Sequence, residues 1–102
     1  ELSATGLEMS SSTKITIRLM KKTNFDGVRI ESNKSIMTVA SGRPMENSIA
    51  NAMSHLIFWM EKDYDWNRWK AYDLLTHVAS ISIGYFGIGT VAVKLNKSYL
   101  VN

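Results

Sequence analysis

The sequence of 102 residues contains no cysteine. Disulfide bonds, thiol catalysis and zinc-finger sites built on cysteine are therefore excluded. A chain without disulfides fits the cytoplasm, and we expect that location. Hydrophobic residues make up 45% of the sequence, which is ordinary for a globular chain and too high for a disordered one.

Long apolar runs and concentrated positive charge are also missing. The longest apolar stretch, Ile81 to Ile88, contains a serine and two glycines. A membrane-spanning helix needs about 20 apolar residues, so we expect no membrane partner. The net charge is +3, but Lys21–Lys22 is the only basic doublet. Because nucleic-acid binding requires a concentrated basic face, we expect no nucleic-acid partner.

The start of the sequence lacks both a methionine and a basic-then-apolar targeting segment. Glu1 opens directly into Glu1–Met9, which has the composition of a β-strand. A start within a strand predicts that this chain was cut from a longer protein. The alternative is a trimmed start of a self-contained domain.

Several segments have the period-two pattern of β-strands. In Thr13–Met20, Ile15, Ile17 and Leu19 alternate with polar residues, which predicts a strand with one face on a core. Further strands are predicted at Val28–Ile30, Ser35–Ala40 and Thr90–Leu95, and the Asn24–Gly27 segment has turn chemistry. Short connections between consecutive strands favour an antiparallel meander.

The pattern changes to a helical period after Pro44. Apolar residues recur every three or four positions from Glu46 to about Lys62, which predicts an amphipathic helix. Asp65 or Asn67 can cap a second helix that we expect to run to about Ile81. The prediction is a single α+β unit over residues 1–102, in which antiparallel strands pack with a helical hairpin.

Few residues offer catalytic chemistry. We expect His55 and His77 to be hydrogen-bonded in the interior or at an interface rather than to bind a metal. Asp63 and Asp65 are predicted to cap and solvate the turn between the helices. Glu1 and Glu8 are seven positions apart, so in a regular strand they face opposite sides and do not form an acid–base pair.

Glycines and aromatic residues leave two readings open. A loop holding Gly84, Gly87 and Gly89 follows a helix, whereas phosphate-binding glycines precede one, so we expect a tight backbone approach here. The aromatic residues of the hairpin form either a stacking platform for a ligand or, as we favour, a core or subunit interface. They are Phe58, Trp59, Tyr64, Trp66, Trp69 and Tyr72.

Two segments resemble the C-terminal part of the acetamidase/formamidase family. Ala71–Ala79 is similar to the family's AYxLLSxxA helix, and the preceding Ile49–Met60 is similar to an alanine- and methionine-bearing helix. Ser80 departs from the pattern, because the family often has an acidic residue there. The resemblance implies that this chain is the C-terminal portion of a larger β-rich enzyme.

The second segment, Glu1–Leu19, resembles the strand pair that follows the family's Gly-Asp-Gly-Glu metal-site motif. Glu1 corresponds to the final acid of that motif, and Gly6–Glu8 to a Gly-x-Glu strand pattern. The preceding Gly-Asp-Gly is absent from this sequence. The resemblance therefore makes Glu1 the candidate catalytic residue, with its preceding motif supplied by another chain.

The resemblance implies a metal-dependent amidase that hydrolyses a small amide to a carboxylate and ammonia or an amine. It implies a divalent metal, with zinc as a candidate, bound mainly by residues outside this chain. The expected partners are a larger N-terminal chain of the same enzyme, separated by processing, and further copies of the assembled unit in a homo-oligomer. The alternative is a non-catalytic module that binds a protein through its Trp/Tyr-rich hairpin.

Overall fold

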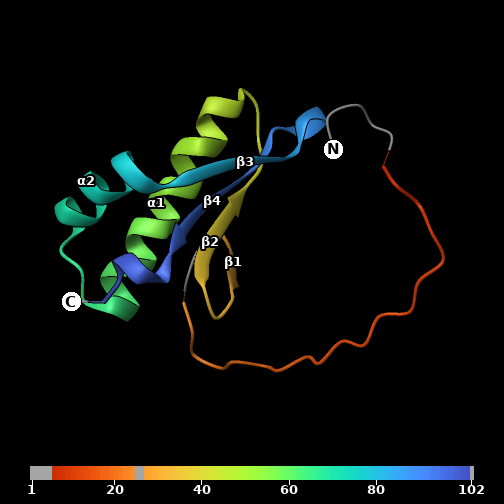
Figure 1. Cartoon of the computed structure of the whole chain (residues 1–102), viewed down its shortest axis with the longest axis horizontal. Helices are drawn as coiled ribbons and strands as arrows, with labels where there is room; N and C mark the ends of the chain where they lie inside the picture. Colours follow the sequence, from red (N-terminus) through yellow and green to blue (C-terminus); the bar gives the residue numbers. More distant parts are fainter. Residues whose placement is uncertain (1–5, 25–26, 102) are drawn as a thin grey trace.

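The computed structural model describes residues 6–24 and 27–101 and has an α+β fold (Figure 1), which confirms the predicted class. Its elements are β1 (Val28–Glu31), β2 (Ser35–Ala40), α1 (Met45–Tyr64), α2 (Arg68–Val78), β3 (Ser80–Tyr85), η1 (Phe86–Ile88), β4 (Thr90–Asn96) and η2 (Lys97–Tyr99). Both 3-10 segments, η1 and η2, are single short turns.

The four strands form one sheet in the order β1-β2-β4-β3, and every neighbouring pair is antiparallel. The central pair is β2 and β4, in which Thr38 lies opposite Val93 and Ile36 opposite Leu95. These four side chains are fully buried because α1 packs across β2 and β4. The predicted meander is therefore modified, since β4 inserts between β2 and β3.

The core lies between the helices and one face of the sheet. Helix α1 contributes Ala52, Leu56 and Met60 at helical spacing, and α2 contributes Ala71 and Leu75. A polar contact crosses this core, in which Thr38 Oγ1 donates a hydrogen bond to the Ala52 carbonyl at 2.6 Å. The helical period read from the sequence thus identifies the buried faces correctly.

The helix ends follow local capping chemistry. Asp65 adopts a left-handed conformation, with φ of 56°, and its N–H donates to the Met60 carbonyl at the end of α1. Asn67 caps α2, because its side-chain oxygen accepts hydrogen bonds from the Trp69 and Lys70 N–H groups. Of the two predicted caps for the second helix, Asn67 is therefore the one used.

The second helix ends earlier than the sequence predicts. It stops at Val78, and Ser80–Tyr85 forms strand β3 instead of a helical end and a glycine loop. The alternation of Ser80, Ile81, Ser82 and Ile83 is a strand pattern, and β-branched isoleucine favours strands. Pairing with β4 overrides the apparent continuation of the helical stripe.

The strand predicted at Thr13–Met20 is wrong for this structure. Gly6–Met20 forms no helix or strand and runs away from the sheet as an extended segment, drawn red to orange in Figure 1. Of the strand predicted at Glu1–Met9, residues 1–5 lie outside the described part, and Gly6–Met9 forms no strand. The alternating pattern is present, but the described residues offer it no paired neighbour, and a strand needs one.

None of the helices in the described ranges is long and apolar enough to cross a bilayer.

Candidate functional site

Glu1, the sequence-predicted catalytic residue, lies outside the described residues, so its role stays a prediction. Glu8 is described and is exposed in the extended N-terminal segment. Within residues 6–24 and 27–101, no group of three or more His, Asp or Glu side chains could hold a metal ion. The described part of the chain therefore provides no metal centre of its own.

His55 lies on α1 with its ring against the start of β1. A Cβ atom added at Gly27 would come within 2.4 Å of His55 Nδ1, so the backbone approaches the ring closely. His55 Nδ1 is buried and has no hydrogen-bond partner within the described ranges. His55 is half-buried, and the hydrogen bond expected for this side chain is not made at Nδ1 within the described ranges.

His77 lies on the exposed side of the last turn of α2. Its Nε2 is 3.8 Å from Asp73 Oδ1, one helical turn earlier, and both side chains are exposed. Sequence reasoning missed this pair, although the four-residue spacing is visible in the sequence. Both side chains are exposed, so the expectation that His77 lies in the interior is wrong for this chain, whereas its expected place at an interface stays a prediction.

The hairpin carries an open apolar groove between its two helices. Three exposed aromatic side chains line it: Trp69 is 74% exposed, Tyr72 58% and Phe58 45%. Ser54, Ile57 and Arg68 complete the lining of a hollow of about 190 Å³. Large aromatic side chains around a concave surface are typical of binding sites and interfaces.

Arg68 gives the groove a positively charged wall. Its guanidinium lies 5.2 Å from the centre of the Phe58 ring, and Nη2 is 2.8 Å from Glu61 Oε2. The first turn of α2 is thereby tied to the last turns of α1. Sequence reasoning named the aromatic residues but missed Arg68, because only the turn between the helices brings it beside Phe58.

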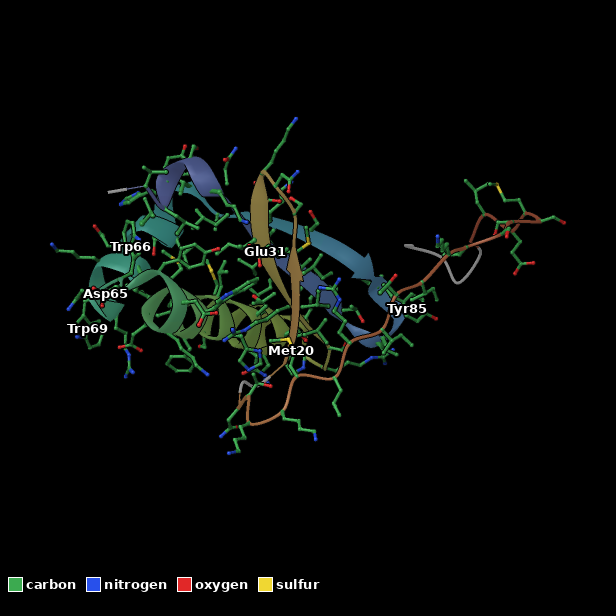
Figure 2. The ribbon with its side chains drawn as sticks, turned by 90° about the horizontal axis from the view of Figure 1, so that it is seen from below. Met20, Glu31, Asp65, Trp66, Trp69 and Tyr85 are labelled. Carbon is green, nitrogen blue, oxygen red and sulfur yellow. The ribbon has the colours of Figure 1, made fainter. Side chains whose placement is uncertain are left out.

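The remaining aromatic residues of the hairpin face inward. Trp59 is 4% exposed and stacks with Arg29, whose guanidinium carbon is 4.9 Å from the ring centre. Trp66 is partly buried against the core, whereas Trp69 lies at the outer edge of the same end of the molecule (Figure 2). The aromatic residues thus divide into two groups. Trp59, Tyr64 and Trp66 pack in or against the core, whereas Phe58, Trp69 and Tyr72 are exposed.

A charged cluster fixes β1 to the helices. Arg29 Nη1 is 3.2 Å from Asp63 Oδ2, and Glu31 forms an ion pair with Lys97. The Tyr64 O–H donates a hydrogen bond to Glu31 Oε1 at 3.5 Å. Burial, and then the negative charge of Glu31, raise the pKa of Tyr64, while the hydrogen bond to Glu31 raises the pKa of Lys97.

The roles of Arg29, Glu31 and Lys97 could not be found from the sequence. These residues come from opposite ends of the described chain and meet only in the folded sheet. Asp63, predicted to solvate the inter-helix turn, instead pairs with Arg29. The two ion pairs join β1 to α1 and to η2, and in each pair a positive charge faces a negative one.

Of the three glycines in this part of the sequence, Gly89 makes the predicted close backbone approach. Gly89 has φ of 64°, and a Cβ atom there would lie 2.0 Å from the Gly42 carbonyl oxygen. The Gly42 N–H donates to the Ile88 carbonyl at 3.1 Å, which joins the two loops. Glycine is required here by packing, because any side chain would collide with backbone.

No protein-family model matches the sequence, and no curated protein matches it. An acetamidase from Yersinia enterocolitica is similar in structure, with a TM-score of 0.69 and 33% identity, over 72% of this chain and 23% of that one. A predicted acetamidase/formamidase from Thermoanaerobacter tengcongensis has a TM-score of 0.68 and 16% identity, over 79% of this chain and 28% of that one.

The chain thus spans about a quarter of the length of the two solved structures, 23% and 28%. The Thermoanaerobacter protein, at 16% identity, supports the fold alone. The Yersinia acetamidase adds sequence likeness at 33% identity to the same arrangement of strands and helices. The described chain therefore has an acetamidase/formamidase-family fold, as its sequence resemblance predicted.

Proposed function

We propose that this chain is one portion of a metal-dependent amidase that hydrolyses a small amide to a carboxylate and ammonia or an amine. The observation that carries the proposal is the likeness to the Yersinia acetamidase, with 33% identity over 72% of this chain. Because the chain matches only 23% of that protein, the proposal assigns the rest of the active site to a larger chain of the same enzyme.

In this proposal, Glu1 is the catalytic carboxylate. Amide hydrolysis adds water to the carbonyl carbon, and the attacking water must lose a proton while the leaving nitrogen gains one. A carboxylate beside the reacting atoms can carry that proton from the water to the nitrogen. Glu1 cannot act as an N-terminal nucleophile, because its side chain lacks the hydroxyl or thiol that such enzymes use.

The metal belongs to the proposal and not to the described residues. A divalent ion, for which zinc is our candidate, would polarise the amide carbonyl and lower the pKa of bound water. Within the described ranges, the His, Asp and Glu side chains form no group of three that fits such an ion. We therefore assign its ligands mainly to the larger chain.

The same proposal includes the assembly and its location. We expect the chain to bind the larger N-terminal chain and to assemble with further copies as a homo-oligomer. The cytoplasm is the proposed location, which rests on the absence of cysteine.

The test is to purify the tagged chain from its own cells with any bound larger chain. Intact mass spectrometry identifies the partner, and ammonia release from formamide and acetamide measures activity. We expect activity that is lost on chelation, restored by zinc, and reduced by about 100-fold or more in Glu1→Gln. A Glu8→Gln control should keep full activity. A complex that hydrolyses neither amide would contradict the proposal.

The second candidate function is a non-catalytic module that binds a protein through the hairpin. It is favoured by one observation, the exposed aromatic groove lined by Phe58, Trp69 and Tyr72. Trp66 is a poor probe for it, because this side chain is partly buried against the core. Trp69→Ala should weaken such an association by about 10-fold or more without unfolding the chain. Metal-dependent ammonia release by the assembled protein, lost in Glu1→Gln, would exclude a purely non-catalytic role.

A further inference from the structure

The two edge strands of the sheet differ in how they are protected from a further strand. Strands β1 and β3 lie at opposite ends of the sheet (Figure 1). On its helix side β1 carries Arg29 and Glu31, which lie opposite the buried residues Thr38 and Ile36. Charged side chains that point inward are one way in which edge strands avoid pairing with other chains. A further strand at the β1 edge would have to cover these charges.

Strand β3 has no such protection. Its sequence, Ser80–Tyr85, contains no charged residue and no proline. Residues 80–84 are all exposed, so the outer edge of the strand is accessible. The register with β4 is regular up to Ile83 and shifts only between Ile83 and Tyr85. Residues 80–83 therefore present regular strand backbone at an open edge of the described sheet.

The helix side of β3 continues the apolar layer of the core. Ile81 lies opposite Val93, Ile83 lies opposite Val91, and both valines are 0% exposed. The two isoleucines are 48% and 45% exposed, because α1 packs on β2 and β4 and the described sheet has no strand beyond β3. Burial of their exposed parts against further apolar side chains would be favourable.

The sequence of β3 is complementary to its own copy. Around a two-fold axis at Ser82, two antiparallel β3 strands place Ile81 of each copy opposite Ile83 of the other. Paired residues point to the same face of a sheet, so the four isoleucines would meet on the helix side. The facing Ser82 hydroxyls can hydrogen-bond on the other side. An axis at Ile81 or Ile83 would instead pair an isoleucine with Ala79 or Tyr85, so the axis at Ser82 fits best.

We propose that the outer edge of β3 is a self-association surface, at which two copies of this chain pair antiparallel and join their four-stranded sheets into one. The occupant is a second copy because the strand is uncharged and complementary to itself, so that no like charges meet across the axis. This inference rests on the proposed function only for its homo-oligomer, whose contact surface it names, and does not depend on amide hydrolysis.

Two matched isoleucines test the surface. Ile83→Lys changes the β3 edge and Ile30→Lys changes β1, and both side chains are 45% exposed, so both variants should fold. Sedimentation equilibrium should show a dimer of the unchanged chain. Ile83→Lys should weaken it by about 10-fold or more, and Ile30→Lys by less than about 3-fold. A chain that stays monomeric at about 1 mM, or equal weakening by the two variants, would overturn the proposal.

Mixed variants test the register. Because position 83 of one copy faces position 81 of the other, a mixture of the Ile83→Lys and Ile81→Glu chains places a lysine opposite a glutamate and keeps one isoleucine pair. This mixture should regain the dimer that each variant alone loses. The control mixture of Ile83→Lys and Ile83→Glu chains places neither charge directly opposite the other and should stay monomeric at the same concentration. Equal recovery in both mixtures would contradict the pairing around Ser82.

Hydrogen exchange of the unchanged chain gives a readout that needs no variant. Amides of residues 80–83 should become more protected as concentration rises, in step with dimer formation. If they are protected only when a larger chain is bound, the occupant is that chain and the proposal is wrong. A β3 dimer in a protein that releases no ammonia would support this inference and remove the proposed function. An active amidase whose self-association Ile83→Lys leaves unchanged would do the reverse.

Discussion

The two faces of the sheet differ in what covers them. On one face, α1 seals Ile36, Val91 and Val93, each 0% exposed. On the other, Val28 and Ile30 remain about half exposed, at 55% and 45%, although they are equally apolar. The second face is mixed, because Lys94, Ser80 and Ser82 also lie on it. On the helix side, Ile81 and Ile83 of the edge strand β3 stay 48% and 45% exposed, so the hairpin covers the central strands more fully than the edge strands.

The largest effect is expected where the covered face is broken. Leu56→Ala removes a fully buried side chain from the contact between α1 and the sheet, and should lower the free energy of unfolding by about 2–5 kcal/mol. Ile30→Ala on the open face should cost less than about 1 kcal/mol in the isolated chain. Urea denaturation of both variants measures the contrast. Equal losses would mean that the two faces do not differ as described.

A smaller loss is expected from the polar contact inside the covered face. Thr38→Val keeps the shape of the side chain but removes its hydrogen bond to the Ala52 carbonyl, which measures 2.6 Å. We expect a loss of about 1 kcal/mol, because a buried hydrogen bond contributes roughly that amount. Thr23→Val, which removes an exposed hydrogen bond, is the control and should be nearly neutral. A stabilising Thr38→Val would show that this contact is not needed.

The cap of α2 tests how firmly the hairpin is held over the covered face. Asn67→Ala removes the side-chain acceptor for the Trp69 and Lys70 N–H groups, and should cost about 1 kcal/mol. Asn67→Asp keeps an acceptor and should retain most of the stability. Thermal unfolding followed by circular dichroism measures both. A loss in Asn67→Asp as large as that in Asn67→Ala would argue against capping.

The smallest effect is expected from alkaline pH at the charged cluster. The folded state raises the pKa of Tyr64 above 10.0 and of Lys97 above 10.5, so it holds both protons more tightly than the unfolded chain. Stability should therefore fall as pH rises above 10. Glu31→Gln removes a cause of both shifts and should flatten this decline. A decline equally steep in Glu31→Gln would contradict the described cluster.

The sequence predicted the fold class, the strands β1, β2 and β4, and both helices, because each carries its own periodic pattern. It failed at β3, where the continuation of a helical stripe through Ile81 competed with the strand pattern of Ser80–Ile83. Only pairing with β4 decides between them. The strand predicted at Thr13–Met20 is wrong for the opposite reason. The segment has a strand pattern, but it forms no strand because a strand needs a paired neighbour.

The candidate site was less predictable than the fold. The aromatic residues could be named from the sequence, but their division into buried Trp59 and exposed Trp69 depends on which side of the hairpin each faces. The contacts of Arg29 with Asp63 and of Glu31 with Lys97 join distant segments and leave no local signal. Glu1, inferred from a family resemblance, remains a prediction.

The most direct test of the central claim is ammonia release from formamide and acetamide after this chain is mixed with the larger chain that purifies with it. The account predicts that neither chain alone hydrolyses the amides and that the mixture does, in proportion to the complex formed. A stable complex that releases no ammonia, or a larger chain that is fully active alone, would contradict it.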